Sequence, residues 1–481
     1  MVARNSHFNS TSGNRRCPGP VGRRELLKLG WRGFSSLSIP LLLKLRSTAA
    51  APPSTSPTSI ILVWLRGGGS HLDTFDPKPQ SASEYRGPYQ TIQTRTEDLH
   101  ITELLPRLAQ ISNRYTLLRS MAHTGGGHPS GSLQVLSGDN DRQDKPRPVL
   151  PDFMSVAHYL RNDPSRNIPN YIGVNAVTRY DSFTIAGPAY LGPAFEPFKI
   201  TGDPSKPHFH VPNVGLPTAA LAQRLQRRVD LKDGLDRMSR FTDQDPKMHA
   251  LDAYQNQALN LLTNPDARIA FDLSREPESV RERYGNHQWG QQCLLARRLV
   301  EAGVEIITTT FDGPLCGRVS NWDDHAVNHH VFKALSFRAP YFDQAVSALI
   351  EDIYSRGMDR NVLVVVTGEF GRTPKISHVA SSGGGVASAP RGTVQPGRDH
   401  WPHANTMLFS GGGLSTGQVI GRTDARGEYV TDRRVGVGDF LATIYRHLNI
   451  DYEHTMIEDF TGRPIPILNQ GTPIPELEKL T

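Results

Sequence analysis

Cysteine is scarce in this sequence. The 481 residues include only Cys17, Cys293 and Cys316, and no two of them have the spacing of a C-x-x-C motif. This scarcity excludes a framework of disulfide bonds. A single bond between Cys293 and Cys316 remains an alternative, but we expect two free thiols.

A surplus of positive charge is missing from most of the chain, although the formal net charge of the whole is +6. Residues 1–51 contain nine lysines and arginines and a single acidic residue, Glu25, so this segment carries +8. The rest of the chain therefore carries 6 − 8 = −2. The high isoelectric point thus gives no support to nucleic-acid binding, and we expect no nucleic-acid partner.

Long apolar runs are also missing from the first 51 residues. The apolar region Phe34–Leu43 is interrupted by Pro40 and falls well short of the ~20 residues that a membrane-spanning helix requires. Gly22–Lys28 contains a pair of arginines, and the small residues Ser47–Ala51 suit signal cleavage. We therefore predict a twin-arginine export signal over residues 1–51, with the Tat translocase as a partner and no stable membrane span. A basic disordered tail is the alternative.

Apolar runs rich in β-branched residues predict buried strands. These runs are Ile60–Leu65, Tyr115–Ser120, Val304–Phe311 and Val362–Val366. Apolar residues at helical spacing predict helices between and after them. These helices are Leu104–Ala109, Pro265–Leu273, Gln291–Ala302, Pro340–Tyr354 and Val437–Leu448. A helix followed by a strand is typical of an α/β fold.

Two stretches have a different composition. The Pro/Asn/Gly-rich residues 139–212 predict loops and short elements that could cover one end of the sheet. Leu221–Leu262 combines helical periodicity with many charges and predicts a helical insertion on the surface. Residues 52–59, rich in Pro, Ser and Thr, predict a linker before the first strand.

The first predicted strand leads into a glycine-rich loop, Gly67–Gly69, followed by polar residues. In open α/β sheets, ligands bind beyond the carboxyl ends of the strands. His71, Asp73 and Asp76 are therefore potential metal ligands. Alternatively, the aspartates only cap a glycine turn.

The second strand leads into a loop in which His123 and His128 flank three glycines. The two histidines could hold a metal ion, or the loop could cradle an anion. Thr124, Ser130 and Ser132 are candidate nucleophiles at the start of a helix. Alternatively, the serines only cap that helix beside solvated histidines.

The densest group of metal-capable residues lies in Asn321–His330, after the third predicted strand. Carboxylates mixed with imidazoles suit Zn, Mn or Fe, whereas oxygen ligands alone suit Mg or Ca. A solvated acidic turn with chance histidines is the alternative. After the fourth strand come Gly368–Pro374 and then Gly397–His403, which add a glutamate, two arginines and further histidines.

Four motifs together resemble the secreted bacterial family called domain of unknown function 1501 (DUF1501), which is abundant in planctomycetes. They are Gly67–Pro79, Trp322–His325, Gly368–Pro374 and Gly397–Pro402. The resemblance implies a branch of the alkaline phosphatase and sulfatase superfamily, with a large, mostly parallel or mixed sheet between helices. It implies a single domain over residues 60–470, with loop and helical insertions at about 139–290 and a tail at 471–481.

The resemblance also implies metal ligands on loops after the strands, but this chain departs from the superfamily pattern. Arg66 stands where an Asp is expected after the first strand, and Glu369-Phe370 stands where an Asp-His pair is expected. One imidazole is therefore missing unless Asp399, His71 or His128 replaces it. No Cys-x-Pro-x-Arg motif occurs, so a formylglycine sulfatase mechanism is not supported.

From these residues we expect an exported hydrolase that uses one or two divalent metal ions (Zn, Mn, Fe, Ca or Mg) to cleave a phosphate or sulfate ester. The expected metal ligands are His71, Asp73, Asp323, His325, Glu369, Asp399 and His400. Arg372 or Arg398 would clamp the anion, and Thr124, Ser130 or water on the metal would be the nucleophile. The substrate would be an anionic small molecule or a polysaccharide ester. An inactive binding protein and a structural metalloprotein of the cell envelope are the alternatives.

Overall fold

The computed structural model describes residues 58–163, 166–212, 265–313 and 321–478, together with residues 214, 224, 227, 228, 315 and 317. The predicted export signal lies outside the described residues, as does nearly all of the predicted helical insertion at 221–262. Cys293 is a free, buried thiol.

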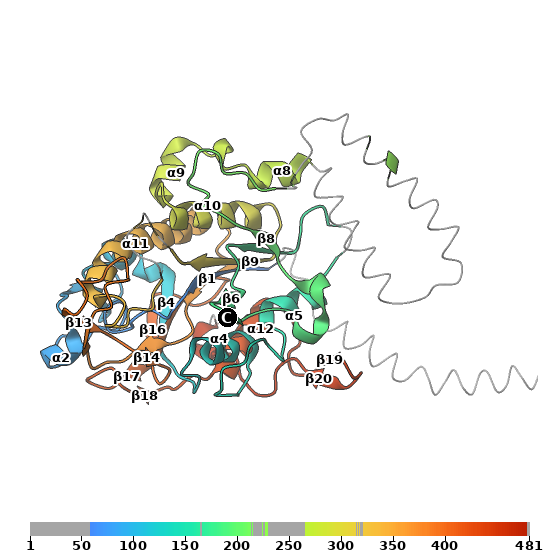
Figure 1. The fold of residues 1–481 in the computed structure, drawn as a ribbon. Coiled ribbons are helices and arrows are strands. Elements are labelled where there is room, and N and C mark those ends of the chain that lie inside the picture. The colour runs from blue at the N-terminus through green and yellow to red at the C-terminus, as the bar shows by residue number, and fades with distance from the viewer. Residues whose placement is uncertain are drawn as a thin grey trace, which may run out of the picture. The chain divides into compact units, whose positions relative to one another are not determined.

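An eight-stranded sheet forms the core (Figure 1). Its strands, in spatial order, are β16 (Gln418–Ile420), β4 (Tyr115–Met121), β15 (Asn405–Gly411), β10 (Val362–Thr367), β1 (Ser59–Leu65), β9 (Ile306–Phe311), β5 (Tyr171–Val174) and β8 (Phe198–Ile200). Seven strands run in one direction, and β15 alone in this sheet runs antiparallel to both of its neighbours. The predicted α/β fold with a large, mostly parallel mixed sheet is confirmed.

The central strand β1 shows why the apolar runs form this sheet. It pairs in parallel with β10 and β9, so that Ile61 lies opposite Val364 on one side and Ile307 on the other. Ile61 and Val63 belong to the apolar core on one face of the sheet, and Ile60 and Leu62 to the core on the other face. A strand covered on both faces needs apolar residues at every position, and this produces the continuous run.

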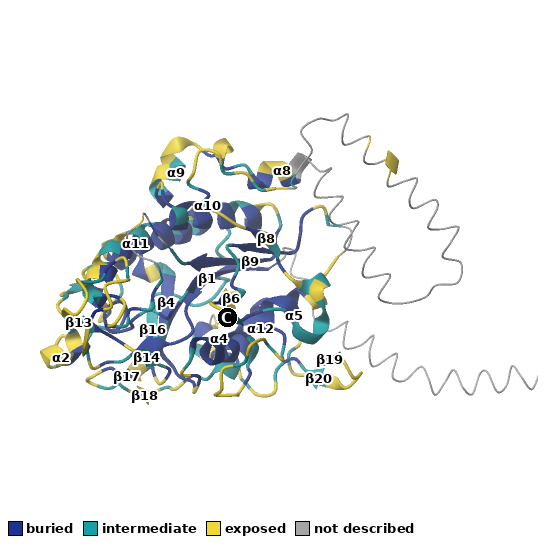
Figure 2. Cartoon of the chain, in the orientation of Figure 1, coloured by how far each residue is buried: buried dark blue, intermediate teal, exposed yellow. Residues whose placement is uncertain are grey.

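Helices cover both faces of the sheet (Figure 1). On one face lie α3 (Pro106–Gln110), α8 (Pro265–Phe271), α9 (Glu278–Tyr284), α10 (Gln288–Glu301) and α11 (Val331–Ser355). On the other face lie α4 (His128–Ser137), α5 (Phe153–Leu160) and α12 (Val437–His447). Figure 2 shows the strands between these helices as buried.

The helix α11 begins nine residues before the predicted start. Pro340 lies inside the helix, although proline is most common at the first helical position, where its missing N–H costs nothing. The side chain of His330 caps the true start by accepting a hydrogen bond from the backbone N–H of Lys333. Proline was therefore a misleading boundary signal here.

The residues between 139 and 212 contribute more to the sheet than the sequence indicated. They supply the last two strands on one side of the sheet, β5 and β8, of only four and three residues, which are too short to show a clear pattern. They also supply a small hairpin, β6 (Arg179–Tyr180) and β7 (Phe183–Thr184). This hairpin follows β5 directly, at the carboxyl edge of the sheet.

The remaining described elements are short and lie at the periphery of the sheet. They are α2 (Ser83–Arg86), β2 (Thr91–Gln93), β3 (His100–Thr102), β11 (Gly371–Arg372), β12 (Ser377–Ala380), β13 (Val394–Gly397), β14 (His400–Trp401), β17 (Arg422–Thr423), β18 (Val430–Asp432), β19 (Met456–Glu458) and β20 (Pro464–Pro466), with short 3-10 turns between them. In the described part of the chain, no helix combines the length and the apolar character needed to cross a membrane.

The strand directions bring distant loops to one edge of the sheet. The segments that follow β1, β4, β9 and β10 leave the sheet at the same edge, because these strands are parallel to one another. The segment before β15 reaches that edge too, because β15 runs the other way. All the predicted site residues lie in these segments.

Candidate metal centre

Four side chains from three segments of the chain meet at the carboxyl edge of the sheet. They are His128 in the first turn of α4, Asp323 and His325 between β9 and α11, and His400 on β14. One ligand atom from each residue lies within 4.8 Å of the others. We call these four residues the His/Asp cluster.

The contacts inside the cluster centre on the carboxylate of Asp323. Its Oδ1 lies 2.9 Å from Nε2 of His325 and 3.3 Å from Nε2 of His400. Its Oδ2 lies 3.2 Å from Nε2 of His128. The Nε2 atoms of His325 and His400 are themselves 2.9 Å apart. Three imidazoles thus present the same ring nitrogen to one carboxylate.

The first glycine loop places Asp323 against the end of β1. Gly67 has a φ of 103°, and a Cβ atom there would lie 2.5 Å from the backbone nitrogen of Asp323. The backbone N–H of Trp322 donates to the carbonyl of Arg66 at 2.8 Å. Glycine is therefore required at position 67 because another loop packs directly on its backbone.

Hydrogen bonds behind the three rings fix their orientation. Nδ1 of His128 lies 2.7 Å from Oε1 of Glu369, and Nδ1 of His325 lies 2.6 Å from Oδ1 of Asp399. Nδ1 of His400 lies 2.8 Å from the carbonyl oxygen of Gly126. These acceptors suit a proton on Nδ1, and with that proton in place a neutral ring presents the lone pair of Nε2 to the cluster.

The side chains of the cluster are electrostatically coupled to one another. Burial alone would raise the pKa of Asp323, but hydrogen bonds from His128, His325 and His400 hold it well below its ordinary value. Burial lowers the pKa of His325, yet its bonds with Asp323 and Asp399 outweigh that effect and raise the pKa to about 9. Burial lowers the pKa of His400.

This donor set fits a divalent metal ion. Three imidazole nitrogens and one carboxylate oxygen suit Zn or Fe better than Ca or Mg, which prefer oxygen ligands. The carboxylate and carbonyl partners of the rings are the usual outer contacts of metal-bound histidine. In addition, Oε2 of Glu369 is buried without a hydrogen-bond partner among the described residues. His128, Asp323, His325 and His400 would hold the ion.

The structure brings together some of the predicted ligands and separates others. Asp323, His325 and His400 belong to the cluster, and Glu369 and Asp399 support its rings from behind. Asp73 is elsewhere: its two carboxylate oxygens lie 2.7 and 3.1 Å from the guanidinium of Arg398, and Oγ of Ser70 donates to it at 2.6 Å.

His71 is also outside the cluster. It is 2% exposed, and its Nε2 bonds to the carbonyl of Gly427 at 2.8 Å. Burial lowers its pKa, so it is a neutral buried imidazole that fastens one loop to another.

Both predicted anion-binding arginines are used inside the protein. The guanidinium of Arg398 is fully buried and also donates to the carbonyls of Thr373, Pro374 and Tyr85. Arg372 is 1% exposed and donates to Oδ1 of Asp323 at 2.6 Å and to the carbonyls of Gly67, Gly68 and Arg398. Arg372 therefore orients the central carboxylate of the cluster.

The candidate nucleophiles have hydrogen-bond partners close to them in sequence. Oγ of Ser130 accepts from the backbone N–H of Gly127 at 3.1 Å, an arrangement typical of a helix cap. Oγ1 of Thr124 accepts from Nε2 of Gln134 at 3.1 Å. Thr124 is exposed, whereas Ser130 is buried.

One residue of the site was not anticipated. Tyr180, in the hairpin β6–β7, donates a hydrogen bond from its hydroxyl to Oδ2 of Asp323 at 3.2 Å. Burial and the charges of Asp323 and Glu369 raise its pKa, so the hydroxyl keeps its proton. The two residues are 143 positions apart, and no motif in the sequence marks the tyrosine.

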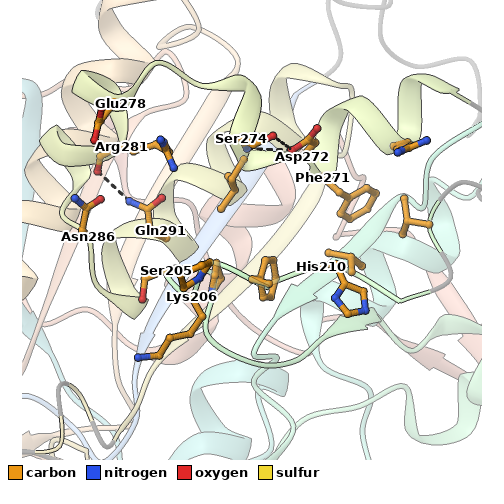
Figure 3. A pocket seen from close by; sticks show the side chains of 17 residues that line it. Ser205, Lys206, His210, Phe271, Asp272, Ser274, Glu278, Arg281, Asn286 and Gln291 are labelled. Carbon is orange, nitrogen blue, oxygen red and sulfur yellow. Dashed lines mark hydrogen bonds between the residues drawn. The ribbon is translucent and has the colours of Figure 1, made fainter. Parts of the chain in front are cut away.

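A separate hollow of about 550 Å³ lies among α8, α9, α10 and the residues near 204–214. Figure 3 shows its mixed lining, which includes the basic residues Lys206 and Arg281, the acidic Asp272 and the aromatic Phe271. No residue of the His/Asp cluster lines this hollow.

Comparisons with known proteins place the chain in a family but not with a characterised relative. Residues 57–477 match the family described as "Protein of unknown function (DUF1501)". No curated protein is similar enough in sequence to match the chain.

Similar solved structures include three proteins of distant sequence. The sulfatase PsFucS1 from Pseudoalteromonas sp. is 11% identical, with 90% of this chain and 74% of that one covered and a TM-score of 0.35. The phosphonate monoester hydrolase of Agrobacterium radiobacter is 11% identical, with 88% and 77% covered and a TM-score of 0.34. The C-terminal periplasmic domain of EcEptC from Escherichia coli, in complex with Zn, is 12% identical, with 90% and 92% covered and a TM-score of 0.34.

Proposed function

The chain belongs to the DUF1501 family, and we propose that this member is an exported, metal-dependent hydrolase that cleaves a phosphate or sulfate ester. The choice of phosphate or sulfate rests on the resemblance of four sequence motifs to the DUF1501 family, which implies a branch of the alkaline phosphatase and sulfatase superfamily. The substrate would be an anionic small molecule or a polysaccharide ester.

One observation carries the proposal: the ligand atoms of the His/Asp cluster converge at a place that solvent can reach. The side chains of Asp323, His325 and His400 are 17, 23 and 22% exposed. A purely structural metal site is usually closed, whereas a catalytic site must admit substrate. A bound divalent ion would supply a Lewis acid that stabilises negative charge on the transferring group and lowers the pKa of water.

The side chains around the cluster have separate roles in this proposal. Glu369, Asp399 and the carbonyl of Gly126 hold the three rings with Nε2 facing inward, and Arg372 holds the carboxylate of Asp323. Thr124, Ser130 and water remain the candidate nucleophiles. Of the two side chains, Thr124 is the more accessible, because Ser130 is buried at the start of α4.

Export is part of the same proposal. The paired arginines near residue 23 predict a twin-arginine signal, and that route carries proteins that fold and take up a cofactor beforehand. A protein whose metal centre is assembled from distant segments must fold before it binds the ion, and this suits export in the folded state. The protein would then be located in the periplasm or the cell envelope.

The test is to measure metal content and turnover together in matched variants. Purified protein is analysed by inductively coupled plasma mass spectrometry and then assayed on aryl phosphates and aryl sulfates with the metal found. We expect near-stoichiometric metal in the wild type, and loss of metal and turnover in His325→Ala. His454→Ala is the control, because His454 is 73% exposed and also contacts an aspartate, Asp451, but lies outside the cluster. Absence of metal after reconstitution would contradict the proposal.

A second candidate function is an envelope protein that uses the metal centre only for structure or binding. The internal bonding of Arg372 and Arg398 favours it, because neither guanidinium is available to clamp an anion. Stoichiometric metal without turnover on any ester would support this candidate against hydrolysis.

A further inference from the structure

The hairpin β6–β7 brings a second set of side chains to the His/Asp cluster. It follows β5, and its turn places Asp181 in the left-handed region, with a φ of 50°. Arg66, at the end of β1, joins the hairpin to the body of the protein. Its guanidinium lies 3.2 Å from Oδ1 of Asp181 and 3.0 Å from Oδ2 of Asp312, beyond β9.

Within the hairpin, Tyr180 lies against the cluster. Its residue exposure is 5%, and its ring stacks on the imidazole of His128 with 3.8 Å between ring centroids and 11° between ring planes. The guanidinium carbon of Arg66 lies 4.2 Å from the centre of the Tyr180 ring. The ring is thus held by a cation–π contact as well as by stacking.

The hydroxyl of Tyr180 completes the support of Asp323. Arg372 holds Oδ1 of this carboxylate at 2.6 Å, and Tyr180 holds Oδ2 at 3.2 Å. The terminal torsion of an aspartate has a broad energy well, so a single contact does not fix the carboxylate plane. Two donors on opposite oxygens do fix it.

The same residue also restrains a histidine. Glu369 bonds to Nδ1 of His128 at 2.7 Å, but one hydrogen bond leaves the ring free to tilt about that contact. Stacking on Tyr180 defines the ring plane and therefore the direction of the Nε2 lone pair.

We propose that Tyr180 is a positioning residue of the metal centre, which fixes the carboxylate plane of Asp323 through its hydroxyl and the ring plane of His128 through stacking. This inference rests on the metal centre of the proposed function but not on the hydrolytic activity. The hairpin, contributed by a region that the sequence presented as loops, is then part of the site.

The two roles can be separated with two variants. Tyr180→Phe removes the hydroxyl and keeps the stack, whereas Tyr180→Leu removes both. Loss of an outer contact of this kind costs about 10- to 100-fold in metal affinity. We expect about tenfold weaker Zn²⁺ binding for Tyr180→Phe, and a larger loss for Tyr180→Leu.

Affinity is measured by competition with a fluorescent chelator, and geometry by the visible spectrum of the Co²⁺-loaded protein. Tyr190→Phe is the control, because Tyr190 lies in the same region of the chain and its ring contacts Phe460 rather than the cluster. Thermal unfolding of the metal-free variants checks that each is folded. A shifted Co²⁺ spectrum in Tyr180→Phe, but not in Tyr190→Phe, would support a positioning role.

Equal affinity and equal Co²⁺ spectra in wild type and Tyr180→Phe would overturn the inference while leaving the metal centre intact. Metal binding without ester turnover would defeat the proposed activity, and the affinity ratio would still decide the role of Tyr180. A wild-type protein that binds neither Zn²⁺ nor Co²⁺ would overturn both the inference and the proposed function.

Discussion

Asp323 and Asp73 lie in loops at the same edge of the sheet, yet they are bonded in opposite ways. Both oxygens of Asp73 are bonded to the guanidinium of Arg398, and neither side chain is exposed. Asp323 shares its charge among Arg372, Tyr180 and three imidazoles, and it is 17% exposed. The first carboxylate is neutralised within the fold, whereas the second is left with capacity to bind a cation.

The difference shows that residue type alone does not identify a ligand. Arg398, Asp399 and His400 are consecutive, but Arg398 is buried against Asp73 while the next two residues serve the cluster. The two carboxylates differ in how an arginine is bonded to them: Arg398 is bonded to both oxygens of Asp73, whereas Arg372 is bonded to only one oxygen of Asp323. Substitutions at Asp73 and at residues of the His/Asp cluster test this difference.

The largest effect is expected from Asp73→Ala. Removing one partner of a buried ion pair leaves the guanidinium of Arg398 uncompensated, and this costs about 3–5 kcal/mol in the free energy of unfolding. The loss is measured by urea denaturation. Metal content per folded molecule should stay the same, because Asp73 does not belong to the cluster.

The control for this variant is Glu196→Ala, which breaks the half-exposed pair between Glu196 and Lys199. Such surface pairs contribute at most about 1 kcal/mol. Metal loss in Asp73→Ala without a loss of stability would mean that Asp73 is a ligand after all, and the comparison would fail.

His400→Ala tests the cluster around Asp323. Removing one of the imidazoles should weaken metal binding about 100-fold, or about 2.7 kcal/mol. Stability of the metal-free protein should change by less than about 1 kcal/mol, because the ring is partly exposed. Chelator competition and urea denaturation give the two numbers.

His403→Ala, three residues further on, is the matched control, because its ring contacts Trp401 and Tyr429 rather than the cluster. Metal loading in His400→Ala equal to that of the wild type would remove His400 from the centre.

A third carboxylate sharpens the comparison, because it is buried without an arginine or an imidazole bonded to it among the described residues. Asp152 caps α5 by accepting from the backbone N–H of Ser155 at 2.7 Å, and burial raises its pKa to about 6. The folded state therefore holds this proton more tightly than the unfolded state does. The contribution of Asp152 to stability is complete below about pH 4 and is lost as the pH rises through 6.

Asp152→Asn should remove this loss of stability at high pH, because asparagine does not titrate. The helix cap should be retained, since asparagine caps helices as well as aspartate does. The difference in unfolding free energy between variant and wild type should rise by about 2 kcal/mol from pH 4 to pH 7. Urea denaturation across that range provides the measurement, and two parallel stability curves would refute the prediction.

The sequence predicted the core strands well. Ile60–Leu65 and Val362–Val366 match β1 and β10 to within one residue, because a strand buried on both faces must be apolar throughout. The short strands β5 and β8 were not predicted, because their pairing with the sheet is a tertiary effect that three or four residues do not encode.

The candidate site was predicted in part for a similar reason. Asp323, His325 and His400 follow or precede core strands, so the topology brings them together. The burial of Asp73 with Arg398 depends on side-chain directions in two loops, and the contact of Tyr180 depends on a hairpin of short strands. Neither is visible in residue spacing.

The position of His400, just before the antiparallel strand β15, has a consequence for when the metal centre can assemble during synthesis. His400 lies at the edge where β10 ends and the antiparallel β15 begins, and it comes after the other three ligands in the chain. The centre therefore cannot assemble on a nascent chain that has not yet passed β14, whichever of the other ligands is already folded. An ion held by all four side chains would therefore mark a polypeptide that has been synthesised past residue 400.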